Sequence, residues 1–217
     1  MEASIIPRVK DVVFALAAAG ECGQQLGRLP LQKMIYLADV LAPIWREISK
    51  PAEFKPYYNG PYDYHIQNTV DALVFRGFVT VSDANFRKIK TIECRYSLTP
   101  SGKTLVNKLT LVSGLKDDLA LFQEISTEVQ RRGWQNIKTI VYAEPTYDSA
   151  RIAENPERLR TESPTKNLSR SFLRDFRDSM VGFDGQPVSR RNLVQMFFAV
   201  LTRHARIKNE SLIKEAA

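Results

Sequence analysis

Hydrophobic residues recur at helical spacing through most of the chain. Apolar positions predict one helix over residues 7–20 and a second over residues 30–43. Pro30 would stand in the first turn of the second helix, where a missing amide hydrogen costs nothing. A third amphipathic helix is predicted from Tyr62 to Gly77, because apolar residues follow one another at intervals of three and four.

A hairpin and a further helix are expected next. Residues 78–98 contain two apolar runs on either side of the polar, basic segment "DANFRKIK", which indicates an antiparallel hairpin with a basic tip. Thr99 and Pro100 are typical of a helix start, and Gly102 permits this helix to pack closely. The earlier segment "EFKPYY" is expected to be a short edge strand, because Pro56 cannot donate a hydrogen bond in a central one.

The second half of the chain is predicted to be helical. One helix ends at Gly133, and "WQNIKTIVYAEP" follows as a short buried helix or strand. Residues 147–166 are polar and contain two prolines, which favours a long loop, and two more helices are expected over residues 167–181 and 189–207. We therefore expect a mainly α protein with a small antiparallel sheet. Its N-terminal half, residues 1–114, would be winged-helix-like, and residues 115–217 would form a helical region.

Three segments of the N-terminal half together carry a family resemblance. "LPLQKMIYLAD", "YYNGPYDYHIQNTVDALVFRGFV" and "YSLTPSGK" resemble a group of small prokaryotic winged-helix-like proteins, the YwgA-like proteins, and more loosely the Panacea antitoxin domains. The resemblance covers residues 9–109, and the chain beyond Gly114 has no counterpart in it. It implies a non-catalytic role, as a regulator or as a domain that holds another protein.

Composition limits the class of protein and its expected location in the cell. The chain has 217 residues, of which 44% are hydrophobic and 25% charged, as in ordinary globular proteins. Its apolar runs are shorter than the ~18 residues of a membrane span, and its N-terminus does not resemble a signal peptide, so we expect a cytoplasmic protein without membrane contact. Two cysteines and two histidines without close spacing indicate neither a disulfide framework nor a metal or cofactor site.

The net charge of +7 makes nucleic acid a candidate partner. The third helix is a poor candidate for reading a DNA groove, because residues 60–75 contain no lysine or arginine and Asp63, Gln67 and Asp71 are expected on its outward side. About twenty residues would also separate it from the second helix, instead of the three or four of a helix-turn-helix. The candidate nucleic-acid-binding residues are therefore the cations of the hairpin and of the C-terminal region: Arg87, Lys88, Lys90, Arg95, Arg170, Arg174, Arg177, Arg190 and Arg191.

Each of these cation groups has an alternative interpretation. The hairpin cations could form a charged edge that prevents aggregation. The three arginines between positions 170 and 177 are expected opposite an apolar face of Leu168, Phe172, Phe176 and Met180, where Asp175 and Asp178 could neutralise them. Arg190 and Arg191 would lie in the first turn of the last helix, where they oppose the helix dipole, a position that favours an anionic partner.

Motifs for catalysis are weak. Glu53, Phe54 and Lys55 match the short E-x-K pattern of some metal-dependent nucleases, with Asp39 as the upstream acid, but so short a motif is common by chance. Glu144 and Asp148 could form a carboxylate pair, yet surface acids explain them better. We expect a protein that is not an enzyme.

An aromatic cluster precedes the third helix. Tyrosine is favoured where one end of the ring is buried and the other is wet, as in interfaces, so we predict protein binding at Tyr57, Tyr58, Tyr62 and Tyr64. Covering of the hydrophobic core is the alternative role for these rings. The expected function is an accessory or adaptor subunit of a prokaryotic regulatory, toxin–antitoxin or antiphage defence assembly, with a DNA-binding transcriptional regulator as the alternative.

Overall fold

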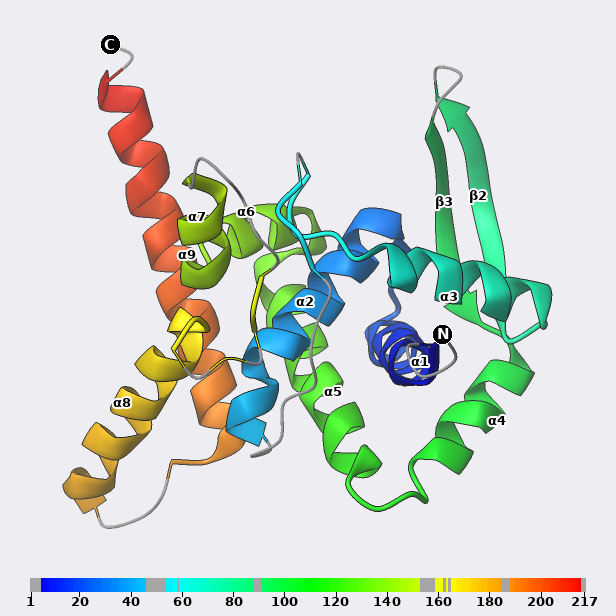
Figure 1. Ribbon diagram of the computed structural model, residues 1–217, viewed down its shortest axis with the longest axis horizontal. Helices are drawn as coiled ribbons and strands as arrows, with labels where there is room; N and C mark the ends of the chain where they lie inside the picture. The colour runs from blue at the N-terminus through cyan, green and yellow to red at the C-terminus, as the bar shows by residue number, and fades with distance from the viewer. Residues whose placement is uncertain are drawn as a thin grey trace.

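The computed structural model describes residues 5–45, 54–57, 59–87, 91–152, 159–161, 163, 165–184 and 188–215 (Figure 1). The protein is mainly α-helical with one small antiparallel sheet, as predicted. Its elements are α1 (Ile5–Glu21), β1 (Leu26–Gly27), α2 (Arg28–Trp45), α3 (Tyr64–Phe75), β2 (Val79–Arg87), β3 (Thr91–Leu98), α4 (Pro100–Leu109), α5 (Leu115–Arg132), the 3-10 helix η2 (Trp134–Asn136), α6 (Ile137–Tyr142), α7 (Pro145–Ile152), α8 (Leu168–Asp184) and α9 (Arg190–Glu215).

One hydrophobic core connects the two halves of the chain. Helix α1 packs against α2, α3, α4 and α5, and α2 packs in turn against α5, α6 and α8. The buried residues of this core run from Val12 in α1 to Leu201 in α9. The division at residue 114 stays a prediction, and the described residues on both sides of it share one core. Each helix of the described residues is too short or too polar to cross a bilayer.

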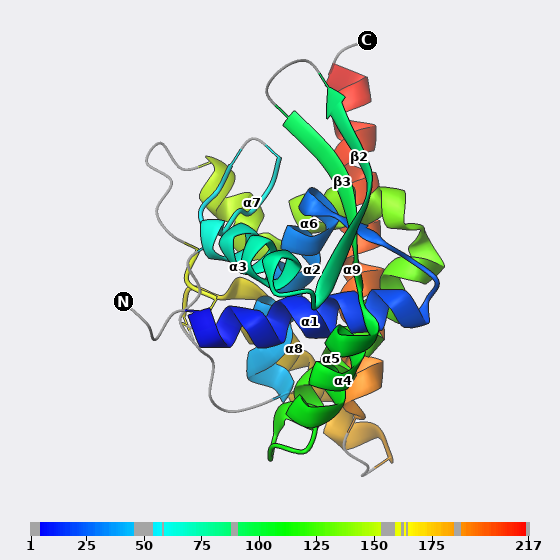
Figure 2. The ribbon, with the colours of Figure 1, turned by 90° about the vertical axis from the view of Figure 1, so that its right-hand side faces the viewer.

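The sheet has the strand order β1-β3-β2. Strand β1 pairs with β3 only at Leu26 and Gly27, whereas β2 pairs with β3 from Val79 to Arg87. The β2–β3 ribbon therefore extends beyond β1. It stands clear of the helices in the view of Figure 1, and Figure 2 shows its two strands side by side. The predicted hairpin is confirmed, but its strands are longer than expected, because "DANFR" belongs to β2 rather than to the tip.

The junction between the sheet and α4 follows the prediction closely. Thr99 is the N-cap and its hydroxyl accepts a hydrogen bond from Gly102 N at 3.1 Å, while Pro100 begins the helix. A Cβ at position 102 would lie 2.2 Å from the carbonyl oxygen of Phe78. Gly102 therefore permits the close approach of α4 to the start of β2.

Several expected boundaries were wrong. Helix α2 continues to Trp45 and includes Pro43, and the expected edge strand is reduced to one bridge between Lys55 and Tyr62. The expected loop 147–166 begins inside α7. Residues 153–158 lie outside the described part of the chain.

Helix α8 does not bury the face that the sequence predicted. Ser169 and Leu173 are buried, whereas Leu168 and Phe172 stay about 40% exposed. The buried positions of α8 thus lie one residue further along the chain than the apolar row we identified.

Candidate protein-binding surface

Residues 54–57 and 59–64, the described residues that lead into α3, form a narrow ribbon with two distinct faces. Lys55 and Tyr62 exchange two backbone hydrogen bonds of 3.0 Å each, and Gly60 N donates to Tyr57 O to close the turn. Side chains alternate between the faces of extended backbone. Phe54 and Asp63 are fully buried on the inner face, and Tyr57 and Tyr64 are 62% and 56% exposed. We call the ribbon, residues 54–64, the tyrosine loop; Tyr58 lies outside the described residues.

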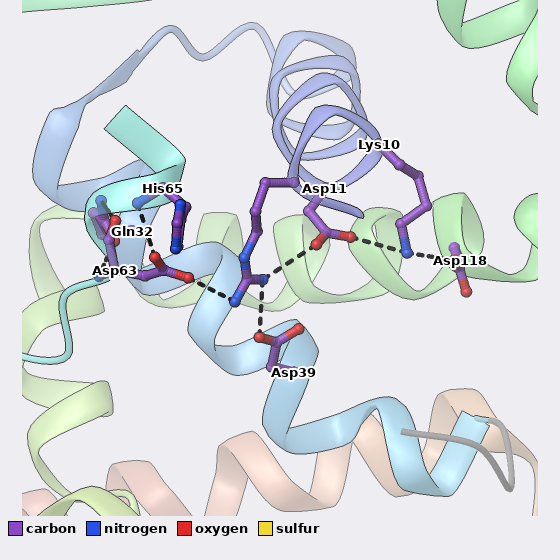
Figure 3. A network of polar contacts seen from close by, with 8 residues as sticks. Lys10, Asp11, Gln32, Asp39, Asp63, His65 and Asp118 are labelled. Atoms are coloured by element: carbon purple, nitrogen blue, oxygen red, sulfur yellow. Dashed lines mark hydrogen bonds and ion pairs between the residues drawn. The ribbon is translucent and has the colours of Figure 1, made fainter. Parts of the chain in front are cut away.

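Arg8 of α1 holds the inner face of the tyrosine loop at both of its ends. Its guanidinium lies 5.3 Å from the centre of the Phe54 ring. It also lies 2.8 Å from Asp63 Oδ2, a contact marked by a dashed line in Figure 3. The contact between Arg8 and Asp63 Oδ2 is an ion pair whose geometry is not that of a hydrogen bond. Arg8 also contacts Asp11 at 3.2 Å and Asp39 at 3.0 Å, so three carboxylates surround one buried cation.

This buried charge cluster joins four helices. Lys10 of α1 extends it to Asp118 of α5 at 2.6 Å, while Asp39 belongs to α2 and Asp63 caps α3 (Figure 3). Burial raises the pKa of Asp39 to about 6, although the nearby Arg8 opposes the shift. Burial alone would lower the pKa of Arg8, but the surrounding carboxylates outweigh it and keep the guanidinium charged.

Two neighbouring residues of α2 also hold the tyrosine loop. The Gln32 amide donates to Asp63 O at 2.9 Å and accepts from Asp63 N at 3.0 Å. Lys33 is 2% exposed and its ammonium donates to Asn59 O. Burial, together with the charge of Lys138, lowers the pKa of Lys33 to about 8.

Glycine is required where the tyrosine loop turns over this lysine. Gly60 has φ +105°, a conformation that side chains rarely adopt, and a Cβ there would lie 3.2 Å from both Lys33 Nζ and the Tyr142 ring. The Asn-Gly-Pro corner therefore follows from close packing against a buried ammonium.

A buried carboxylate supports the loop from the C-terminal half. Glu144 accepts hydrogen bonds from the Tyr36 hydroxyl at 2.5 Å, from the Ser169 hydroxyl at 2.6 Å and from the amides of Thr146 and Tyr147. Our expectation that Glu144 is a surface acid was wrong, because its four donors stabilise a fully buried carboxylate. The Tyr147 hydroxyl, whose pKa burial raises to about 12, donates in turn to Tyr57 O at 3.2 Å.

The outer face of the tyrosine loop carries aromatic and cationic groups. The Tyr57 and Tyr62 rings lie 5.9 Å apart, and the Arg28 guanidinium lies over Tyr62 at 5.3 Å and donates to its hydroxyl. Tyr64 lies against His65, with ring centres 3.8 Å apart. We call this face the tyrosine surface; it consists of Arg28, Lys55, Tyr57, Tyr62 and Tyr64.

Helix α3 continues the tyrosine surface away from the loop. Tyr64, Asn68, Ala72 and Phe75 form its exposed stripe, and Phe75 is 93% exposed. Asp63 does not face outward as expected, because it caps the helix and pairs with Arg8. Asp71 remains on the outside, where Gln67 donates to it at 2.8 Å.

Those cations predicted to contact nucleic acid that the structure describes are divided among β2, β3, α8 and α9. Arg87 ends β2 and Arg95 lies on β3, where it pairs with Asp83 at 3.4 Å. The side chain of Arg87 and the whole of Lys88 and Lys90 lie outside the described part of the chain.

The C-terminal cations pair largely with carboxylates of the same chain. Arg174 and Arg177 contact Asp175 and Asp178 at 3.6 and 3.3 Å, and Arg170 is half-buried in the first turn of α8. Arg190 and Arg191 begin α9 as predicted, and each faces an acid of α5, Asp117 at 3.7 Å and Glu124 at 3.5 Å respectively. These acids offset the unfavourable helix dipole, so the position of the arginines does not by itself require an external anion.

The acids that a nuclease would use do not assemble among the described residues. Asp39 pairs with Arg8, and Glu53 lies outside the described part. Within the described ranges, groups of three or more histidine, cysteine or acidic side chains that could hold a metal ion are absent.

Our sequence reasoning did not identify the residues that hold the tyrosine loop, namely Arg8, Gln32, Lys33 and Tyr147. A signal was present in "LPLQKMIYLAD", where Gln32, Tyr36 and Asp39 recur on one helical face inside an apolar run. Polar groups at buried positions need partners, so this stripe indicated an internal polar network. No protein-family model and no curated protein matches the chain, so the geometry of this surface carries the functional argument.

Proposed function

We propose that the protein is a non-catalytic accessory or adaptor subunit that binds another protein through the tyrosine surface. The assembly would be a prokaryotic regulatory, toxin–antitoxin or antiphage defence complex in the cytoplasm. The resemblance of residues 9–109 to YwgA-like proteins and Panacea antitoxin domains supports this class, and the winged-helix-like arrangement of the N-terminal half is part of the same proposal.

The way in which the tyrosine loop is held is the observation that carries the proposal. Arg8, Gln32, Lys33 and Tyr147 hold its inner side, yet Tyr57 and Tyr64 remain exposed. Fixing a loop before binding reduces the conformational entropy lost on association. Tyrosine and arginine are also among the side chains enriched in protein interfaces.

Affinity capture from the native cells tests the proposal. The tagged wild-type protein should retain a defined protein partner after nuclease treatment. The double variant Tyr57→Ser/Tyr64→Ser should lose it, because the exposed rings supply the contact area. Leu111→Ser/Val112→Ser is a matched control, since these exposed apolar residues lie in the turn after α4. A partner that both variants retain equally would refute the proposed surface.

The β2–β3 ribbon favours a second candidate function, a DNA-binding transcriptional regulator. An isolated two-stranded ribbon is marginally stable, and this one extends beyond β1, which pairs with β3 only at Leu26 and Gly27. Neutralising Arg170, Arg174 and Arg177 would remove up to three phosphate contacts. Because two of these arginines already meet aspartates, the salt dependence of duplex binding should flatten by a slope of about one rather than three. A salt titration on one duplex measures this.

A further inference from the structure

The tyrosine surface contains and adjoins cations that meet no carboxylate among the described residues. They differ in this from exposed arginines such as Arg95, which pairs with Asp83, and Arg191, which pairs with Glu124. In the described part of the structure, Arg28 and Lys55 contact no acidic side chain, and the same holds for Lys138 beside the loop. These cations therefore keep their charge available to a partner.

The geometry directs two of these cations to the same side as the tyrosines. Lys55 is directly opposite Tyr62 in the backbone bridge, and side chains opposite one another project from the same face. Arg28 is held over the Tyr62 ring, which fixes its guanidinium without neutralising it. An arginine fixed in this way presents its remaining N–H groups with little further loss of entropy.

Two further positive charges lie behind and beside the loop. Lys33 is buried under the Asn59–Gly60 corner and is paired with a carbonyl oxygen rather than with a carboxylate. Lys138 lies 5.4 Å from the ring of Tyr142, which itself packs against Gly60. A buried charge is poorly screened by salt, so it raises the electrostatic potential at the surface above it.

We propose that the tyrosine surface binds an acidic segment of a partner protein, with carboxylates on Arg28 and Lys55 and apolar side chains against Tyr57 and Tyr64. This inference rests on the proposed adaptor function and names the chemistry of the partner. Charge complementarity steers such a segment to the surface, and the fixed tyrosine rings supply contact area.

A protein segment fits this surface better than a nucleic acid does. A nucleic acid carries a charge on every nucleotide. Along α3 it would meet the exposed Asp71, which adjoins the stripe, and no lysine or arginine before Arg76. A protein segment can place its carboxylates at the loop and neutral side chains along α3. The apolar end of that stripe, Phe75, suits such neutral side chains.

Selection from a displayed library of short random peptides against the immobilised full-length protein tests the inference. Aspartate and glutamate should be enriched together with apolar residues. A synthetic labelled peptide from the selection should bind the wild type, and Arg28→Glu/Lys55→Glu should weaken this binding by at least about tenfold, since two attractive contacts become repulsive. Lys103→Glu/Lys108→Glu on α4 is the matched control, because it makes the same change in net charge at exposed positions and should change affinity less than about threefold.

Each outcome decides a different claim. Peptides without acidic enrichment, or equal binding by both charge-reversal variants, would overturn the inference. A single-stranded oligo-dT that competes with the peptide and binds more tightly would assign the surface to nucleic acid and overturn it as well. If the native partner is lost in Tyr57→Ser/Tyr64→Ser but retained in Arg28→Glu/Lys55→Glu, the adaptor function stands and the acidic partner chemistry is wrong.

Discussion

Replacing Lys33 with methionine should change how the stability of the protein depends on pH. The ammonium of Lys33 is buried, and its pKa falls from 10.5 to about 8 in the folded protein. The unfolded chain therefore binds more protons than the folded chain between these two values, and the free energy of unfolding rises with pH through this window. Below about pH 8 the buried ammonium lowers the free energy of unfolding by its full amount. Above about pH 10.5 this destabilisation has disappeared.

The size of the effect follows from the shift. A difference of about 2.5 pKa units corresponds to about 3 kcal/mol across the whole window. Between about pH 7.5 and pH 9.5, the part of the window open to equilibrium measurements, the wild type should gain about 2 kcal/mol relative to Lys33→Met. At neutral pH the free energies of unfolding of the wild type and Lys33→Met should differ little, because two effects of the substitution oppose each other. The variant removes a buried charge, but it also leaves Asn59 O without its hydrogen-bond donor, which costs about 1–3 kcal/mol.

Urea unfolding at several pH values measures this difference. Subtracting the free energy of unfolding of the wild type from that of the variant cancels the contribution of the tyrosines. Their raised pKa values change stability in the direction opposite to Lys33, and they do so equally in both proteins. Lys103→Met, the same substitution at an exposed position of α4, is the control. A difference between wild type and Lys33→Met that does not change with pH would refute the assignment of a desolvated ammonium beneath the tyrosine loop.

Three further substitutions test the packing that holds the tyrosine loop and the sheet. Gly60→Ala should destabilise the protein by about 2 kcal/mol, because the residue has φ +105° and its new methyl group would press against Lys33; thermal unfolding measures the loss, and a stability equal to wild type would contradict it. Gly102→Ala should be more severe, since the methyl group would lie 2.2 Å from Phe78 O; soluble protein of unchanged melting temperature would be inconsistent with this contact. Arg8→Met should lower the free energy of unfolding by about 3–5 kcal/mol, because it leaves buried carboxylates without their cation. Proteolysis at the tyrosine loop should also become faster, and a loop that stays protected would show that Arg8 does not hold it.

Local signals in the sequence predicted most of the fold. Thr99, Pro100 and Gly102 marked the start of α4 because capping and close packing depend on residues next to one another in the chain. Gly133 marked the end of α5 for the same reason. Protein binding at the tyrosines stays a prediction, and of the four residues named for it Tyr57 and Tyr64 are exposed.

The inner side of the candidate site depends on contacts that are distant in sequence. Asp63 looked like a surface residue of α3, but Arg8, which precedes it by more than fifty positions, draws its carboxylate inward. Glu144 was expected to be a surface acid, but the hydroxyls of Tyr36 and Ser169 donate hydrogen bonds to it in the interior. A hydrophobic pattern gives the face of a helix that is buried, and it does not show which polar residue on that face finds a partner.

Site-specific photocrosslinking in native cells tests the central claim most directly. The substitution Tyr57→p-benzoylphenylalanine places a reactive ketone on the tyrosine surface, and Leu111→p-benzoylphenylalanine places the same group at an exposed control position. We expect one predominant protein adduct from position 57 that position 111 does not give. An adduct that forms only from position 111, or an adduct with nucleic acid alone from position 57, would contradict the assignment of the tyrosine surface as the site of protein binding.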